Sequence, residues 1–266
     1  MMAQTQGENA VLKPNQLKRR MAGGKNMFGV WLHAAHPMVV EALADTGYDC
    51  LVIDNEHGPS NLEQTRAQLQ ASVPYDCGMC VRIPWNDPVY IKQVLDLGAD
   101  TLMVPMVQTA AEAQAVVDAC RYPPKGKRGM GPWRAMAQGI PLDAYAAHMA
   151  ENLFVICQIE SPQAAENAAA IAGVDGVDML FVGPYDLSGA LGLPNQFENP
   201  THRRYVDMAL AGAAAAGKPC GIVPHGPYDA ASLFERGFRF VAASTDFGLM
   251  RRAALAEIAG LSKALG

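Results

Sequence analysis

This chain of 266 residues lacks the features that mark several large classes of protein. None of its apolar runs approaches the roughly 20 residues that a membrane span requires, so no membrane helix is predicted. The first 15 residues are polar and contain no apolar segment of the kind found in signal peptides. No basic cluster exceeds residues 18–20 or 125–128, and the net charge is −5, which argues against a nucleic-acid partner.

Cysteine is present, but its placement favours neither a disulfide framework nor a metal site. The six cysteines lie mostly inside apolar, strand-like runs. Cys77 and Cys80 have the spacing of a zinc or redox pair, but no second pair accompanies them. Buried free thiols in a reducing cytosol are the favoured interpretation, which predicts a cytoplasmic protein.

Strand-like and helix-like segments alternate along the chain, without a linker or a shift in composition. The expected strands are 28–32, 50–54, 79–83, 101–107, 153–159, 179–183, 220–223 and 238–243. The expected helices are 37–46, 61–71, 87–97, 110–121, 143–151, 162–171, 202–216, 228–236 and 249–265. Residues 122–134 are rich in Gly, Pro and Arg and are expected to form a loop.

Eight strand–helix units of this size predict a single (β/α)8 TIM barrel over residues 1–266. About the first 20 residues are expected to be flexible or peripheral. An open, doubly wound sheet is the alternative. It is disfavoured because no Gly-x-Gly-x-x-Gly follows the first strand, where Trp31-Leu-His33 makes a poor phosphate turn.

Four of the expected strands end in charged or polar side chains. In a parallel α/β fold the carboxyl ends of the strands meet at one edge, where chemistry is done. Charged residues at the ends of several buried strands do not all belong to the core. We therefore expect one site formed by Asp54, His57, Arg82, Gln158, Glu160 and Asp186.

Glu160 and Asp186 are candidate metal ligands. Side chains alternate along a strand, so Gln158 and Glu160 point the same way, into the mouth of the barrel. Two neighbouring carboxylates repel each other unless a positive charge lies between them. Their hard oxygen atoms favour Mg²⁺ or Mn²⁺. The alternative is a pair of solvated carboxylates or helix N-caps, and Asp186 before Leu-Ser fits a cap.

Arg82 and His57 are the other two candidates for chemistry. A buried guanidinium needs an anion, which for Arg82 is either Asp54 on the neighbouring strand or a substrate oxyanion. His57 is a candidate general base near neutral pH, or else a structural histidine at the rim.

Lysine is missing from the strand ends. Lys92 lies within an expected helix, and Lys218 precedes a strand at the opposite end of the barrel. A Schiff-base enzyme needs a lysine at the barrel mouth, so carbanion chemistry here would use a metal ion as its electron sink.

Seven motifs together show a family resemblance. They are Ile53-Asp54-Asn55-Glu56-His57-Gly-Pro, Val81-Arg82-Ile-Pro-Trp85-Asn86-Asp87-Pro, Gln158-Ile-Glu160, Gly183-Pro184-Tyr185-Asp186-Leu-Ser, and the segments 91–98, 102–107 and 121–131. With them the chain closely resembles the class II pyruvate aldolases of the HpcH/HpaI family. The likeness runs from about residue 28 to residue 265.

The resemblance implies a metal-dependent lyase that reversibly cleaves 4-hydroxy-2-oxo acids to pyruvate and an aldehyde, through a metal-bound pyruvate enolate. Mg²⁺ or Mn²⁺ is favoured, with Co²⁺ and Zn²⁺ as alternatives. Glu160 and Asp186 would be the metal ligands, and Gln158 would contact the substrate and a metal-bound water. A homo-oligomer, specifically a hexamer, is also implied.

The resemblance also implies a role for each remaining residue. Arg82, oriented by Asp54, would polarise the keto oxygen, and His57, made more basic by Asp96, would activate a water. The turn formed by Gly183, Pro184, Tyr185 and Asp186 would receive the substrate carboxylate on its backbone. Met130 and Val223 would line the aldehyde end.

The chain departs from the family pattern at a few positions near the site. Tyr185 replaces a residue that is usually small, and His33, His36 and His225 stand where other residues are usual. Two alternatives to an aldolase therefore remain. One is a related enolate-forming lyase or decarboxylase acting on oxaloacetate or a thioester, and the other is a zinc enzyme using His33, His36, His57 and His225.

Overall fold

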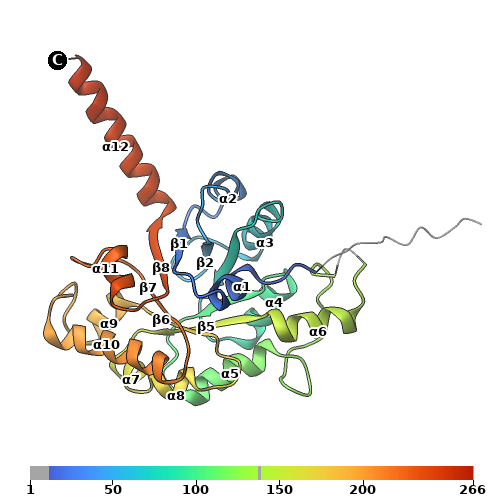
Figure 1. The fold of residues 1–266 in the computed structure, drawn as a ribbon. Coiled ribbons are helices and arrows are strands. Elements are labelled where there is room, and N and C mark those ends of the chain that lie inside the picture. Colours follow the sequence, from blue (N-terminus) through green and yellow to red (C-terminus); the bar gives the residue numbers. More distant parts are fainter. Residues whose placement is uncertain (1–11, 137–138, 266) are drawn as a thin grey trace, which may run out of the picture.

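The computed structural model describes residues 12–136 and 139–265 of the chain. Eight parallel strands close into a barrel in the order β1 to β8, which confirms the predicted TIM barrel (Figure 1). The strands are β1 Met27–Leu32, β2 Cys50–Asp54, β3 Gly78–Arg82, β4 Thr101–Val104, β5 Phe154–Ile159, β6 Met179–Val182, β7 Cys220–Ile222 and β8 Phe240–Thr245. Each of them lies within a few residues of its predicted range.

Helices follow the strands and surround the barrel. They are α1 Gln16–Ala22, α2 Pro37–Leu43, α3 Leu62–Ala71, α4 Pro88–Asp96, α5 Ala110–Cys120, α6 Leu142–Asn152, α7 Pro162–Glu166, α8 Ala168–Ala172, α9 Pro184–Ala190, α10 Pro200–Ala215, α11 Ala230–Glu235 and α12 Asp246–Leu265. The predicted cap at Asn61 is confirmed, because its side chain accepts from the backbone N–H of Gln64. The sequence did not predict α1 and α9.

The barrel has two apolar layers. Inside it, large side chains such as Trp31, Phe181 and Phe240 pack together, while a second layer fills the space between strands and helices. Gly29 and Gly221 make room for Phe240, since an added Cβ would lie 2.6 Å and 3.1 Å from its ring atoms. All six cysteines are buried free thiols, as expected.

The bottom of the barrel is closed by α1. Leu17 is fully buried in the inner layer, and Asn15 donates to the carbonyl of Asp100 and to Oγ1 of Thr101. A Cβ on Gly78 would lie 2.3 Å from Cδ1 of Leu17, so the glycine at this position creates the space for α1. The expectation of a peripheral segment up to about residue 20 therefore does not hold for Asn15 and Leu17, which are buried. The part of that expectation covering residues 1–11 lies outside the described residues.

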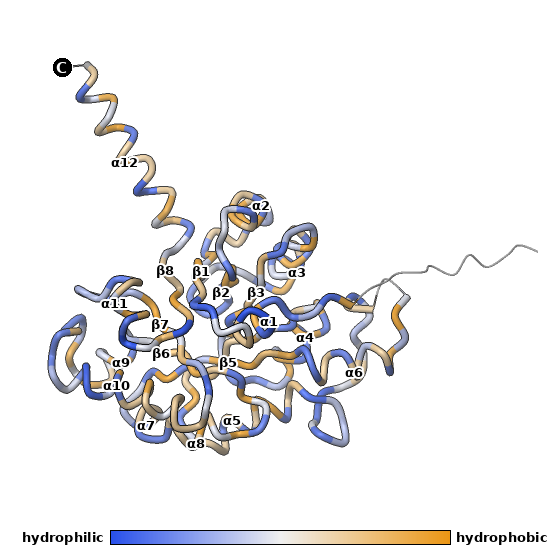
Figure 2. Tube along the Cα trace, viewed as in Figure 1, coloured by the Kyte–Doolittle hydropathy of each residue, from blue (hydrophilic) through white to orange (hydrophobic). Residues whose placement is uncertain are grey.

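The last helix, α12, leaves the barrel instead of folding back onto it. Figure 1 shows it projecting outward from the end of β8. Apolar and polar residues alternate along it (Figure 2), and its side chains from Met250 to Ala264 are exposed. Within the described residues, none of the helices is long and apolar enough to span a membrane.

The burial of Leu17, on the helix α1 that closes the bottom of the barrel, gives a prediction about stability. Leu17→Ala removes a fully buried side chain and should lower the free energy of unfolding by about 2–5 kcal/mol, measured by urea denaturation. Arg19→Ala is the control on the same helix. Its surface ion pair with Asp76 should contribute about 1 kcal/mol or less. Equal effects of the two substitutions would contradict the conclusion that burial of Leu17 holds α1 against the barrel.

Candidate active site

A cavity of about 520 Å³ opens at the carboxyl ends of the strands. Nine of the predicted residues line it, namely His57, Arg82, Gln158, Glu160, Gly183, Pro184, Tyr185, Asp186 and Val223. Asp54 lies fully buried directly behind Arg82. The predicted residues at the ends of the strands therefore do lie together at one edge of the barrel.

Asp54 and Arg82 form the central ion pair of the cavity. They are aligned residue to residue on the neighbouring strands β2 and β3. Nε of Arg82 donates to Oδ1 of Asp54 at 2.9 Å, and Nη2 donates to Oδ2 at 2.7 Å. The guanidinium lies 4.3 Å from the centre of the Trp31 ring. A planar fork held on two sides has little freedom to turn.

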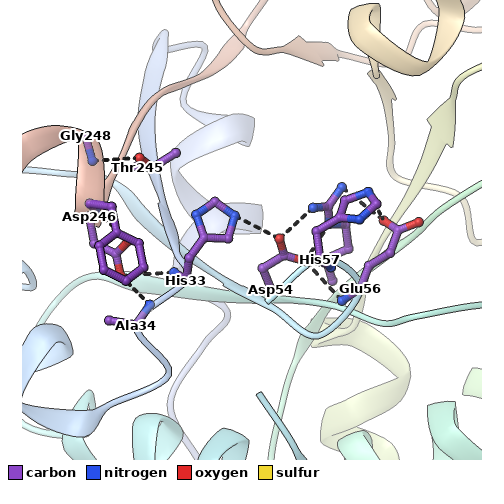
Figure 3. Close-up of polar contacts among 10 residues, drawn as sticks. His33, Ala34, Asp54, Glu56, His57, Thr245, Asp246 and Gly248 are labelled. Atoms are coloured by element: carbon purple, nitrogen blue, oxygen red, sulfur yellow. Dashed lines mark hydrogen bonds and ion pairs between the residues drawn. The ribbon is translucent and has the colours of Figure 1, made fainter. Parts of the chain in front are cut away.

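Asp54 also accepts hydrogen bonds from groups other than the Arg82 guanidinium. The backbone N–H groups of Glu56 and His57 donate to Oδ1, and Nε2 of His33 lies 2.9 Å from Oδ2 (Figure 3). Burial by itself would raise the pKa of Asp54, but the hydrogen bonds from His33 and Arg82 hold it well below its usual value. Asp54 is therefore an ionised anchor and not a proton donor.

The free side of Arg82 faces Glu56 and the cavity. Oε2 of Glu56 lies 3.0 Å from Nη1 of Arg82. Two of the five N–H donors of the guanidinium are used on Asp54, so others remain for a bound anion. His57 stands next to this group with a side chain that is 61% exposed, and its Nε2 is 3.9 Å from Glu56. It has the access to solvent that a base working through a water needs.

Glu160 and Gln158 line the cavity at the end of β5, two strands along the barrel from Arg82 on β3. Oε2 of Glu160 accepts from the backbone N–H of Met106 at 2.8 Å, and Oε1 accepts from Nε2 of Gln158 at 3.1 Å. Met106 adopts a positive φ of 54°, a conformation rare outside glycine, and its N–H donates to the carboxylate. An added Cβ on Gly183 would lie 2.6 Å from Oε1, so glycine is needed there.

The charge on Glu160 is poorly compensated within the chain. Burial raises its pKa to about 7, the Met106 hydrogen bond opposes this shift, and Glu56 and Asp186 add to it. Asp186 lies exposed in the first turn of α9 and lines the same cavity. A cation between these two carboxylates would relieve the repulsion that raises the pKa of Glu160.

The donor set fits a hard divalent ion. Oε1 of Gln158 is buried and has no hydrogen-bond partner, which leaves an oxygen acceptor free beside the two carboxylates. Mg²⁺ is commonly held by one or two carboxylates, with water and substrate completing its shell. In the described ranges no three His, Cys, Asp or Glu side chains converge as a metal cluster. His36 caps α2 and His225 contacts the carbonyl of Val223, so the four histidines do not gather as a zinc enzyme would need.

Two predicted residues lie outside the cavity. Asp96 ends α4, and its Oδ1 accepts from Nη2 of the buried Arg128 at 2.7 Å. Within one chain its partner is therefore Arg128 and not His57. Met130 is 56% exposed in the loop after α5 and does not line the cavity. The structure brings neither residue to the cavity of its own chain.

The sequence analysis did not assign Trp31, Ser244 or Thr245 to the site, and it named His33 only as a ligand of the alternative zinc enzyme. Trp31 and His33 come from the end of β1, and Ser244 and Thr245 come from the end of β8. Trp31-Leu-His33 has the same pattern as the other strand ends, an apolar run followed by a polar group, and that pattern was sufficient to find it. The backbone N–H of Met106 has no comparable signal in the sequence.

Comparison with known proteins places the chain in a family. Residues 27–253 match the family model described as HpcH/HpaI aldolase/citrate lyase. The chain is 44% identical over 233 residues to a 4-hydroxy-2-oxovalerate aldolase of Novosphingobium aromaticivorans, which covers 87% of this chain and 88% of that protein. It is 41% identical over 254 residues to a 4-hydroxy-2-oxo-heptane-1,7-dioate aldolase of Salmonella typhimurium, which covers 94% and 97%.

A solved structure agrees with these relatives. An HpcH/HpaI aldolase/citrate lyase family protein from Burkholderia cenocepacia J2315 superposes with a TM-score of 0.87 at 34% identity, covering 93% of this chain and 99% of that one. The predicted resemblance is therefore confirmed, and the chain is a lyase that belongs to the HpcH/HpaI aldolase/citrate lyase family.

Proposed function

We propose that the protein is a divalent-metal-dependent aldolase that reversibly cleaves 4-hydroxy-2-oxo acids to pyruvate and an aldehyde. One observation carries the proposal. The cavity holds a clamped guanidinium, Arg82, at the end of β3 and a poorly compensated carboxylate pair, Glu160 and Asp186, after β5 and β6. The names of the two relatives above support the substrate class, since both describe aldolases of 4-hydroxy-2-oxo acids.

The substrate would be held at its carboxylate and keto groups. A Mg²⁺ or Mn²⁺ ion at Glu160 and Asp186 would act as a Lewis acid toward the 2-oxo acid. The backbone N–H groups of Tyr185 and Asp186 lie in the first turn of α9, where such groups lack partners within the helix, and would receive the carboxylate. Arg82 would donate to the keto oxygen.

Cleavage would then proceed by moving one proton. A water held by His57 would take the proton from the C4 hydroxyl, and the C3–C4 bond would break to release the aldehyde. The electrons of that bond would pass to the keto oxygen and form the pyruvate enolate, whose charge the fixed Arg82 donors stabilise. Protonation at C3 gives pyruvate. No lysine is among the described residues that line the cavity, so a Schiff base has no candidate there.

We also propose that the protein works as a homo-oligomer, a hexamer by family resemblance, in which α12 packs on another copy. Its exposed apolar side chains include Phe247, Met250, Leu255, Ile258 and Leu261. On the outer face of β1, Phe28 is 43% exposed, and none of the described segments after β8 folds back to cover it. In such an assembly α12 of one copy packs on the surface of another, and α12 of a second copy covers Phe28.

The assembly also bears on Asp96. The family resemblance assigns this carboxylate to His57, yet the fold keeps the two apart within a chain. We propose that Asp96 serves His57 of a neighbouring subunit.

The first prediction concerns the carboxylate pair. Glu160→Gln and Asp186→Asn each remove a charge needed to hold the ion and should abolish the cleavage that Mg²⁺ or Mn²⁺ supports. Pyruvate release from a 4-hydroxy-2-oxo acid, with and without a chelator, is the measurement. Glu41→Gln on the exposed face of α2 is the control and should remain active. Full activity of metal-free wild-type protein, or decarboxylation as its only reaction, would contradict the proposal.

The second prediction concerns Arg82. Arg82→Lys keeps the charge but cannot hold Asp54 and the oxyanion in one planar fork, so kcat should fall by about 10²–10³. Steady-state cleavage rates provide the measurement, with Arg121→Lys at a surface ion pair as the control. A loss of less than about threefold would mean that Arg82 only neutralises Asp54.

The third prediction concerns assembly. Ile258→Asp places a charge on the apolar stripe of α12 and should shift the protein to smaller species in sedimentation velocity. Glu257→Gln, one residue away, should leave the size unchanged. Wild-type protein that sediments as an active monomer would show that α12 has another purpose.

A further inference from the structure

We propose that His33 is a positioning residue of the aldol reaction, which donates from Nε2 to Asp54 and so holds the Arg82 guanidinium in its working orientation. The proposal rests on the proposed function, because it assigns a role in the reaction that Arg82 would serve. His33 directly follows β1, lines the cavity and has no part in the reaction steps proposed above.

His33 is held at its backbone and at its ring. Its backbone N–H donates to Oδ2 of Asp246 at 3.0 Å, and the next N–H, of Ala34, donates to the same oxygen at 2.8 Å (Figure 3). Its ring reaches Oδ2 of Asp54 at 2.9 Å. Because its backbone and its ring are both held, His33 can fix the position of the Asp54 carboxylate that it contacts.

The contact with Asp54 determines which ring nitrogen carries hydrogen. An ionised carboxylate only accepts hydrogen bonds, so Nε2 of His33 must be protonated in this pair. The low pKa of Asp54, to which the His33 hydrogen bond contributes, keeps that carboxylate ionised. The bond is therefore charge-assisted and among the stronger kinds in a protein.

His33 and Arg82 share one oxygen atom. Oδ2 of Asp54 accepts from Nε2 of His33 and also from Nη2 of Arg82, whereas the backbone donors at residues 56 and 57 all reach Oδ1. Without His33, Oδ2 would be held by Arg82 alone. The carboxylate could then turn about its own axis and carry the guanidinium with it. Small misplacements of a catalytic group reduce rates strongly.

The alternative is that His33 touches the substrate. Its side chain is 26% exposed and faces the cavity, so it has the access that a proton donor or an aldehyde contact needs. Glutamine separates the two roles, because its amide N–H₂ can reach Asp54 as a donor but does not titrate. A positioning role survives His33→Gln, whereas a proton-transfer role does not.

The experiment compares His33→Ala, His33→Gln and the control His36→Asn. His36 lies three residues further on, caps α2 and is outside the cavity lining, and asparagine preserves the cap. Three quantities are measured: kcat and KM for cleavage, the rate at which pyruvate exchanges its methyl protons for deuterium, and thermal unfolding. Proton exchange reports enolate formation at Arg82 without any aldehyde present.

We expect His33→Ala to lower kcat and the exchange rate together by about tenfold to a hundredfold, with KM changed by less than about threefold. His33→Gln should recover most of both rates, and His36→Asn should match the wild type. All four proteins should be folded at the assay temperature.

Three results would overturn the positioning role. Activity of His33→Ala equal to wild type would remove any role, and equal losses in the glutamine and alanine variants would make His33 a proton-transfer group. A changed aldehyde preference with unchanged proton exchange would make it an aldehyde contact. A wild-type enzyme that neither cleaves 4-hydroxy-2-oxo acids nor exchanges pyruvate protons would instead overturn the proposed function itself.

Discussion

The ion pair between Asp54 and Arg82 is the constraint on which the rest of the site depends. Burying a guanidinium is costly unless its charge is matched and its donors are used. Two strands in register meet this need, because they set the two side chains side by side at the open edge of the barrel. Asp54 is satisfied by donors from β3, from the residue that follows β1 and from the loop after β2, so Arg82 can keep part of its fork directed at the cavity.

Glu160, which follows β5, has the reverse charge balance to Arg82. Glu160 is buried, accepts one backbone N–H and one amide, and is left without a cationic partner among the described residues. The divalent ion of the proposed mechanism would supply the missing positive charge there. The cavity therefore has one fixed positive group, Arg82, and a pair of carboxylates at which a second positive charge would be stabilised. That arrangement suits a substrate whose reacting atoms gain negative charge.

Most of the barrel could be predicted from the sequence, because each buried parallel strand is a short apolar run bounded by turn residues. The run 51–54 ends in Asp54 and the run 153–159 precedes Glu160, so the strand positions also predicted which side chains meet. The prediction failed at α1, whose charged residues around Leu17 resemble a peripheral segment. Burial of Leu17 depends on the space above Gly78, and local sequence does not report such long-range packing.

The sequence by itself therefore determined the alternation of strands and helices, the barrel, and the identity of the charged groups at its edge. Periodicity and strand length depend on residues close together in the chain, so they can be read locally. Only the tertiary structure decided that His33 shares an oxygen of Asp54 with Arg82, that Met106 donates its N–H to Glu160, and that Asp96 pairs with Arg128. Each of these contacts joins residues 21 to 54 positions apart and depends on the closure of the barrel, which no local pattern encodes.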